Sequence, residues 1–471
     1  MYMNFIRSAS FIAAINATFN TVFIFVMKRL LFVVFFSVTV IKADSLHPNN
    51  LPASISPDTF KPVNEESSKL GQLLFYDAIL SGNKNIACAS CHHPTLGTGD
   101  GVSLSLGEGG QYLGPNRVPL KGKNRPEQRI GRNSPALFNL GADEFTVMFH
   151  DGRLEQDLSR PSGIRTPLEE EMVQGFDSIL SAQSMFPVLS PDEMAGHYSE
   201  NEIAQAVRMG VITGDNGAWQ KIAQRIQAIP EYVDHFKDTV PHIQHAEDIH
   251  FTDIANVIAD FIASEWQAID SPFDRFLIHK QALPPLAEKG LAVFYGKGQC
   301  VRCHSGVFQT DQSFHSIALP EFGPGKVARF EAQPQDFGRS RVTGNPDDRY
   351  KFKTPSLRNV ALTAPYGHNG AFSSLTAIIQ HHLNPEASLK HYSFDQLILS
   401  PLPEQDKKDL DKQRSKAAIP QLLASSELTK IELSTQEVNA LEAFLNTLTD
   451  SANGQGRLGI PLHVPSGLPV E

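Results

Sequence analysis

The chain has 471 residues, of which 41% are hydrophobic and 20% are charged, and its formal net charge at pH 7 is −10. A chain of this length can bury more than one hydrophobic core, so we expect two or three globular domains. The negative net charge argues against nucleic acid and against an anionic membrane surface as general partners.

The first 43 residues are typical of an export signal. A basic pair directly after Met27 precedes an apolar run over residues 30–41, and the small residue Ala43 ends the segment. This order of basic, apolar and small residues predicts a signal peptide over residues 1–43, with Met27 as a candidate for the true start. Residues 1–26 also contain apolar stretches, which leaves an N-terminal membrane anchor as the alternative.

A C-x-x-C-H pentad occurs twice and uses all four cysteines of the chain. Such pentads attach c-type haem, because the two thiols bond to the haem vinyl groups and the histidine becomes an axial ligand of the iron. A zinc site or a redox-active thiol pair would not explain the histidine after each pair. We therefore expect two covalent haem c groups and, since haem is attached outside the cytoplasmic membrane, a periplasmic protein. The haem-binding residues are Cys88, Cys91 and His92, and Cys300, Cys303 and His304.

The segments around the two pentads resemble each other in a fixed order, which predicts an internal duplication. A helix-like Gly-x-x-x-Phe-Tyr pattern precedes each pentad, and a proline-containing pattern and a His-x-Gly triplet follow it. The first set is Gly71–Tyr76, Ser134–Leu140 and His150–Gly152; the second is Gly290–Tyr295, Thr354–Val360 and His368–Gly370. We expect a mainly α protein with two cytochrome-c-like haem domains related by a pseudo-twofold axis, and with long ordered loops over residues 97–135 and 320–346.

Apolar periodicity predicts a helix from Asp253 to Asp270, which Ser271-Pro272 ends, and a closing helix from Glu437 to Leu448. Trp266 extends the apolar face of the first of these helices, so core packing is favoured for it over electron relay. The expected division of the chain is a first haem domain over residues 44–270, a second haem domain over residues 271–450, and a C-terminal tail over residues 451–471.

None of the eight methionines follows the second pentad, so a methionine ligand from the second half is excluded for its haem. His381 and His382 end a helix-like segment over residues 375–380 and are the local candidates, with a solvated helix face as the alternative. The acidic run Glu169–Glu171 follows His150 at a distance that could bring it over the first haem, although such runs usually lie on a solvated face.

Together these elements resemble the bacterial di-haem cytochrome c peroxidase and MauG family, over roughly residues 60–450. The resemblance implies an oxidoreductase whose first haem is peroxidatic and whose second haem receives electrons, with Glu171 as the catalytic acid/base. It also implies one Ca²⁺ between the domains, bound by Asn133, Thr363 and the Pro365 carbonyl, for which loop shaping is the alternative. The matching elements are both pentads, Arg132–Pro135, Phe149–Arg153, Glu171-Met172 and Lys353–Tyr366.

Three departures from the family pattern change these expectations. Where the peroxidases carry a capping histidine in a Gly-His-Gly turn, this chain has Glu108, so the first haem is expected to be open unless His93 or another group substitutes. Fourteen residues after His368, where the peroxidases have Met and MauG has Tyr, His382 predicts a bis-His second haem of lower potential. The tryptophan between the haems is replaced by His150, whose role the sequence leaves open.

Three functions remain in competition. The first is a periplasmic peroxidase that reduces hydrogen peroxide to water with electrons from a small redox protein, a cytochrome c or a cupredoxin. The second is a MauG-like enzyme that oxidises side chains of a partner protein; the non-Met ligand favours it, and the missing tryptophan argues against a close MauG mechanism. The third is a non-catalytic di-haem electron carrier. A homodimer is also open.

Overall fold

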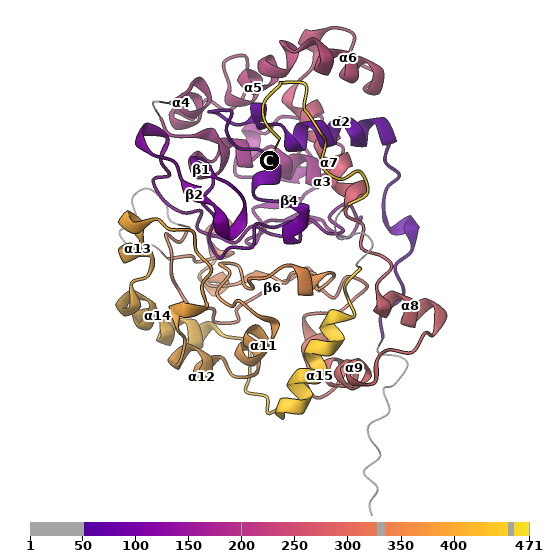
Figure 1. Cartoon of the computed structure of the whole chain (residues 1–471), viewed down its shortest axis with the longest axis vertical. Coiled ribbons are helices and arrows are strands. Elements are labelled where there is room, and N and C mark those ends of the chain that lie inside the picture. The colour runs from indigo at the N-terminus through magenta and orange to yellow at the C-terminus, as the bar shows by residue number, and fades with distance from the viewer. Residues whose placement is uncertain (1–50, 199, 327–334, 451–455, 471) are drawn as a thin grey trace, which may run out of the picture. The chain divides into compact units, whose positions relative to one another are not determined.

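Helices form most of the regular structure, and the strands are short, so the expected mainly α class is confirmed (Figure 1). The computed structural model describes residues 51–198, 200–326, 335–450 and 456–470. The expected signal segment, residues 1–43, lies outside the described residues. In the described part of the chain, no helix combines the length and the apolar character needed to cross a membrane.

The helices and strands follow one another along the whole described chain. The helices are α2 Glu65–Tyr76, α3 Ile179–Ser184, α4 Glu202–Met209, α5 Ala218–Gln227, α6 Pro230–Thr239, α7 Phe251–Glu265, α8 Pro272–His279, α9 Pro285–Tyr295, α10 Ser340–Thr343, α11 Leu375–Leu383, α12 Pro385–Lys390, α13 Pro403–Asp409, α14 Lys412–Ser425 and α15 Thr435–Asn446. The antiparallel strand groups are β1 Gly110–Gln111 with β2 Val118–Pro119, then β3 Val147–Met148, β4 Leu154–Gln156 and β5 Ile164–Arg165, then β6 Phe314–His315 with β7 Phe352–Lys353.

Two helix pairs are built alike, α2 on α7 and α9 on α15 (Figure 1). Gly71 of α2 lies against the carbonyl group of Val257, and Gly290 of α9 lies against the carbonyl group of Ala440. A Cβ atom at either glycine would overlap that carbonyl oxygen, so only glycine lets the helices approach this closely. The glycine of each repeated sequence pattern therefore marks the crossing point of one helix pair.

The aromatic residues of the pattern repeat the same geometry. The rings of Phe75 and Phe261 have centroids 5.2 Å apart with an interplanar angle of 55°, and those of Phe294 and Phe444 are 5.1 Å apart at 58°. Trp266 joins the first group, 5.4 Å from Phe75 and 5.2 Å from Phe261, and is fully buried. The prediction that Trp266 packs in the core is confirmed.

Both long helices end earlier than the sequence predicts, and for the same reason. Helix α7 ends at Glu265 instead of Asp270, because Asn139 forms hydrogen bonds with the backbone that follows the helix. The Asn139 side-chain oxygen accepts from Ala268 N–H at 2.8 Å, and the Asn139 backbone N–H donates to the Trp266 carbonyl at 2.9 Å. Such a side chain competes with the helical ladder.

Helix α15 likewise ends at Asn446 instead of Leu448. Asn359 accepts from Asp450 N–H at 2.7 Å and donates its own N–H to the Leu448 carbonyl at 3.0 Å. Asn139 and Asn359 occupy equivalent places in the repeated patterns, and both have a left-handed backbone, with φ of 62° and 58°.

Residues 50–471 form one compact unit. Side chains of each half pack in a hydrophobic core of the other half, which explains why the two halves do not separate into two units. Phe308, which follows the second pentad, packs in the core of the first half, 5.2 Å from Phe145 and 6.3 Å from Phe60 between ring centroids. Conversely, Leu104 of the first half packs with Phe322 in a core of the second.

The segment 456–470 runs back over α2 and α7 (Figure 1). The Glu265 carboxylate accepts hydrogen bonds from the N–H groups of Leu458 and Gly459, at 2.8 to 3.0 Å. The Ser466 hydroxyl donates to Asp77 at 2.7 Å, and Val464 is buried in the core of the first half. The segment expected to be a tail therefore belongs to the surface of the first half.

Replacing Gly71 or Gly290 with Ala should lower the free energy of unfolding by about 1–3 kcal/mol, because the added Cβ forces the paired helices apart. Lys289→Ala, at the exposed neighbouring position of α9, is the control and should change it by less than about 0.5 kcal/mol. Denaturant unfolding measures both. A stabilising effect of either glycine substitution would contradict the crossing geometry.

Candidate functional site

The first pentad follows α2 and begins with a 3₁₀ turn over Cys88–Ser90. The His92 ring nitrogen Nδ1 lies 3.0 Å from the Thr98 carbonyl oxygen and 3.3 Å from the Ser134 hydroxyl. Because a carbonyl oxygen only accepts, Nδ1 carries the proton, and Nε2 keeps its lone pair for a metal. Burial lowers the pKa of His92, which favours the neutral ring.

The second pentad has the same construction. It begins with a 3₁₀ turn over Cys300–Arg302, and His304 Nδ1 lies 3.1 Å from the Gln309 carbonyl oxygen. Burial, together with His382, lowers the pKa of His304 to about 4. No disulfide joins the four cysteines. Each pentad thus presents two thiols and one imidazole nitrogen, which is the donor set that c-type haem requires.

His382 faces His304, and His381 does not. The His304 and His382 ring centroids are 6.5 Å apart, and His382 Nδ1 lies 2.8 Å from the Ile378 carbonyl oxygen, which leaves its Nε2 for a metal. If an iron atom bonded both Nε2 atoms at about 2.0 Å, with each nitrogen about 1.1 Å from its ring centroid, the centroids would be roughly 6 Å apart. The pair therefore fits a haem iron.

Both ring nitrogens of His381 already have partners. Nδ1 lies 3.0 Å from the Ser388 hydroxyl, Nε2 lies 2.7 Å from the Ile317 carbonyl oxygen, and the residue is fully buried. Of the two histidines that the sequence left open, the geometry favours His382 as the ligand and His381 as a core residue.

The first site is not symmetric with the second. Over the described ranges, no other aromatic or imidazole ring lies against that of His92. His93 is buried, and its Nδ1 lies 2.7 Å from the Thr95 hydroxyl within the same turn. No facing histidine comparable to His382 is present among the described residues of the first half.

Glu171 ends a 3₁₀ turn over Glu169–Glu171 and is exposed, whereas Met172 is buried. Arg160 pairs with Glu169 at 2.6 Å and reaches Glu170 at 3.9 Å. Within the described segments, the Glu171 carboxylate has no hydrogen bond and no ion pair, and none joins it to His92. It is the one carboxylate of the acidic run that Arg160 does not hold.

The loop with the Gly-Glu-Gly turn is fastened by buried groups. Glu108 is 1% exposed and accepts hydrogen bonds from the amides of Asn83 and Asn85, at 2.8 and 2.7 Å. The buried Arg117 guanidinium donates to the Leu106 carbonyl, to the Gly107 carbonyl at 2.9 Å and to the Tyr112 carbonyl at 2.6 Å. The residue at the family's capping position is therefore bound to the segment that precedes the first pentad.

Arg132 connects the two halves. Its guanidinium donates to Asp336 at 2.6 and 2.8 Å and contacts Asp151 at 2.7 Å, and all three residues are buried. Burial alone would raise the pKa of both carboxyls, but Arg132 outweighs it, holding Asp336 at about 2 and, with Arg153, Asp151 well below its usual range. Both carboxylates therefore stay ionised.

His150 and His368 flank the segment that follows Arg132. His150 Nε2 lies 3.1 Å from the Asn133 carbonyl oxygen, and Asn133 N–H donates to the His368 carbonyl at 2.8 Å. The His368 ring stacks on Phe352, with centroids 3.5 Å apart. Burial, with Arg132, lowers the pKa of His150 to about 4, and burial lowers that of His368 to about 3, so both rings are neutral at neutral pH.

Two of the three residues expected at a calcium site form other hydrogen bonds. The Asn133 amide donates to the Val102 carbonyl at 2.8 Å, and the Thr363 hydroxyl donates to the Val360 carbonyl at 3.1 Å. These bonds leave the Asn133 side-chain oxygen and the Thr363 oxygen lone pairs as acceptors. No hydrogen bond joins Asn133, Thr363 and Pro365 to one another among the described residues.

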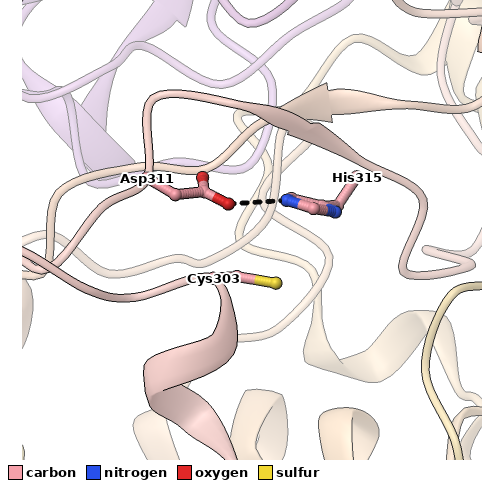
Figure 2. Close-up of side chains that lie close together, drawn as sticks. All are labelled: Cys303, Asp311 and His315. Carbon is pink, nitrogen blue, oxygen red and sulfur yellow. Dashed lines mark hydrogen bonds and ion pairs between the residues drawn. The ribbon is translucent and has the colours of Figure 1, made fainter.

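Cys303, Asp311 and His315 lie close together beside the second pentad (Figure 2). His315 Nε2 lies 2.8 Å from Asp311, as the dashed line in Figure 2 shows, and Nδ1 lies 2.5 Å from Glu427. Haem attachment would consume the Cys303 thiol, so we do not assign these three residues as a metal site. His315 was not among the residues predicted from the sequence. Its spacing of four residues from Asp311 was the available signal, whereas Glu427 is too far along the chain for its contact with His315 to be predicted.

Comparisons with known proteins identify similar haem enzymes. The family model described as di-haem cytochrome c peroxidase matches residues 65–282. The chain is 29% identical over 372 residues to cytochrome-c peroxidase IdrP1 of Pseudomonas sp. (strain SCT), covering 74% of this chain and 79% of that protein. It is 28% identical over 363 residues to the methylamine utilization protein MauG of Methylorubrum extorquens, covering 76% and 80%.

Solved structures give the same fold. A MauG-like protein associated with microbial copper homeostasis is 25% identical with a TM-score of 0.55, and the match covers 86% of this chain and 94% of that one. The di-haem peroxidase BthA of Burkholderia thailandensis is 20% identical with a TM-score of 0.54, covering 86% and 91%; at this identity the likeness concerns the fold alone.

The His315 contacts predict a pH-dependent stability. Burial alone would lower the pKa of His315, but the hydrogen bonds to Glu427 and Asp311 outweigh it and raise the pKa above its ordinary value. The resulting stabilisation is complete below the unfolded pKa of about 6.5 and is lost as pH rises through the folded pKa. In His315→Asn the thermal midpoint should therefore fall most below wild type near pH 6, with a difference that shrinks at higher pH.

Thermal unfolding between pH 6 and about pH 9 measures this difference. His391→Asn, at an exposed position of the same half, is the matched control and should follow the wild-type pH profile. A His315→Asn difference that grew with pH would contradict the assignment.

Proposed function

The chain belongs to the di-haem cytochrome c peroxidase and MauG family, and from this premise we propose that it reduces hydrogen peroxide to water at the first haem, with electrons that enter through the second. Proteins of this family are oxidoreductases that use haem c. The finer assignment of the two haems rests on the side chains around each pentad.

The inequality of the two sites carries the proposal. His304 and His382 face each other at a separation that suits two axial ligands of one iron, which leaves no position for peroxide. His92 presents one imidazole nitrogen, without a second ring opposite it in the described chain. A haem with one protein ligand suits peroxide binding, and a haem with two suits electron transfer.

Glu171 is proposed as the acid/base at the first site. When bound, haem would supply the coordination position for peroxide and the electrons that reduce peroxide to water. Glu171 would move a proton from the proximal to the distal peroxide oxygen, so that the distal oxygen leaves as water. Its freedom from Arg160, which holds Glu169, supports this role. Its exposure is compatible with a side chain that faces a substrate entry.

A MauG-like oxidation of a partner protein is the second candidate. The His382 ligand supports it, because a second haem without methionine differs from that of the peroxidases, and the chain is as similar to MauG as to the peroxidases. The neutral His150 in place of a tryptophan argues against a close MauG mechanism. Turnover of peroxide with a reduced small cytochrome would separate the two, since the MauG-like enzyme should not sustain it.

We also propose the setting in which this chemistry takes place. Covalent haem attachment and the signal over residues 1–43 support export to the periplasm, where a small cytochrome c or cupredoxin would donate electrons. A calcium ion on Asn133, Thr363 and the Pro365 carbonyl would use neutral oxygen ligands, which suit Ca²⁺ weakly. The boundaries at residues 44–270 and 271–450 remain our proposed haem domains.

Low-temperature EPR of the oxidised protein tests the unequal sites. We expect one high-spin signal from the first haem and one low-spin signal from the second. His382→Met should alter only the low-spin signal and raise the reduction potential of that haem, because a methionine ligand favours the reduced iron. His381→Gln is the matched control and should leave the signal in place. Two low-spin signals in the wild type would favour the electron carrier.

Glu171→Gln should slow the reaction of the oxidised or half-reduced protein with peroxide by about 100-fold or more, because glutamine cannot transfer the proton. Stopped-flow absorbance of the haem bands measures this rate. Glu170→Gln, the exposed neighbour, should react at the wild-type rate. Equal rates for wild type and Glu171→Gln would refute the acid/base role.

A further inference from the structure

A cluster of side-chain oxygens lies where three segments of the first half meet. The Glu108 carboxylate accepts from the amides of Asn83 and Asn85, at 2.8 and 2.7 Å. The same Asn83 amide nitrogen donates to the Glu200 carboxylate at 2.9 Å. Two carboxylates therefore share one amide group, and Glu108 is 1% exposed.

No positive side chain neutralises this pair within the described residues. Neither Glu108 nor Glu200 forms an ion pair there. The Arg225 guanidinium reaches the same region, but it donates to the Ser81 and Gly82 carbonyls, at 2.6 and 3.0 Å, and pairs with Glu202. Buried carboxylates without a counter-charge are costly, so such a pair calls for a cation.

Three oxygens of the cluster are buried and have no hydrogen-bond partner: Glu108 Oε2, Glu200 Oε1 and Asn85 Oδ1. The amide orientations explain why all three are acceptors. Asn85 uses its nitrogen on Glu108, and the Asn83 oxygen already accepts from Asn201 at 2.9 Å. The region thus offers three surplus oxygen acceptors, while both N–H groups of the Asn83 amide are already used.

We propose that this cluster binds one Ca²⁺ through Glu108, Glu200 and Asn85. Carboxylate and amide oxygens are the ligands of hard cations, and Ca²⁺ accepts irregular sets of six to eight oxygens that water can complete, whereas Mg²⁺ demands near-ideal octahedral geometry. The site shares no residue with the interdomain calcium site proposed above.

The ion would fix the Gly-Glu-Gly turn to the segment that leads into the first pentad. Asn85 stands three residues before Cys88, and Glu108 N–H donates to the Asp192 carbonyl at 3.0 Å, beside the segment that contains Glu200. Calcium would therefore join three loops around the first haem motif and hold the turn in one position.

The test uses the full-length holoprotein after dialysis against EDTA, titrated with CaCl₂ in a calorimeter. Wild type should bind one more Ca²⁺ per chain than Glu108→Gln, and Glu200→Gln should bind that ion at least tenfold more weakly. Glu202→Gln, which removes a neighbouring carboxylate that already pairs with Arg225, is the matched control and should bind as wild type does. Asn133→Ala separates this ion from the interdomain one.

Thermal unfolding supplies a second readout, because the difference in unfolding temperature between wild type and Glu108→Gln should change sign when calcium is added. In EDTA, Glu108→Gln should unfold at a higher temperature than wild type, because it removes a buried charge beside the half-buried Glu200 carboxylate. In excess CaCl₂, wild type should unfold at the higher temperature. Equal Ca²⁺ stoichiometry in wild type, Glu108→Gln and Glu200→Gln would overturn the proposal and leave water as the partner of these oxygens. Should Glu108→Gln fail to fold, Glu200→Gln, at a half-buried position, decides the question.

Discussion

The buried contact of Arg132 with Asp151 and Asp336 is the interaction on which the arrangement of both haem sites depends. The residues that follow Arg132 reach both halves: Ser134 contacts the ring of His92, and Asn133 bonds to the backbone of His368 and accepts from His150. A guanidinium that binds one carboxylate with two nitrogens and another with the third fixes direction as well as distance. Removing Arg132 would leave the buried Asp336 carboxylate without an ion pair among the described residues.

Around this contact, the histidines are kept neutral by burial. Each axial candidate donates Nδ1–H to a backbone carbonyl, which fixes the tautomer and aims Nε2. Neutral rings with a fixed tautomer suit ligation, since a protonated imidazole cannot bind a metal. Two such histidines, His304 and His382, face each other at the second pentad, and His92 has no facing ring in the described chain, so the proposed difference between the haems would rest on backbone contacts.

Local patterns in the sequence were sufficient for the pentads, for the helical segments and for the apolar helix face that Trp266 extends, because each depends on residues close together in the chain. They were insufficient wherever a distant partner decides. The ends of α7 and α15 depend on Asn139 and Asn359, and the bond of His315 to Glu427 joins residues far apart. The role proposed for Glu171 rests on family resemblance, since nothing in an acidic run distinguishes one carboxylate from its neighbours.

The return of residues 456–470 to α2 and α7 has a consequence for the order of assembly. Both haem motifs are synthesised before this segment, so the first half reaches its final surface only after the second half has been made. Until then, Glu265 lacks its backbone donors and Val464 has not filled its place in the core. During that interval part of the core of the first half is uncovered. A haem group could therefore be attached before residues 456–470 pack against α2 and α7.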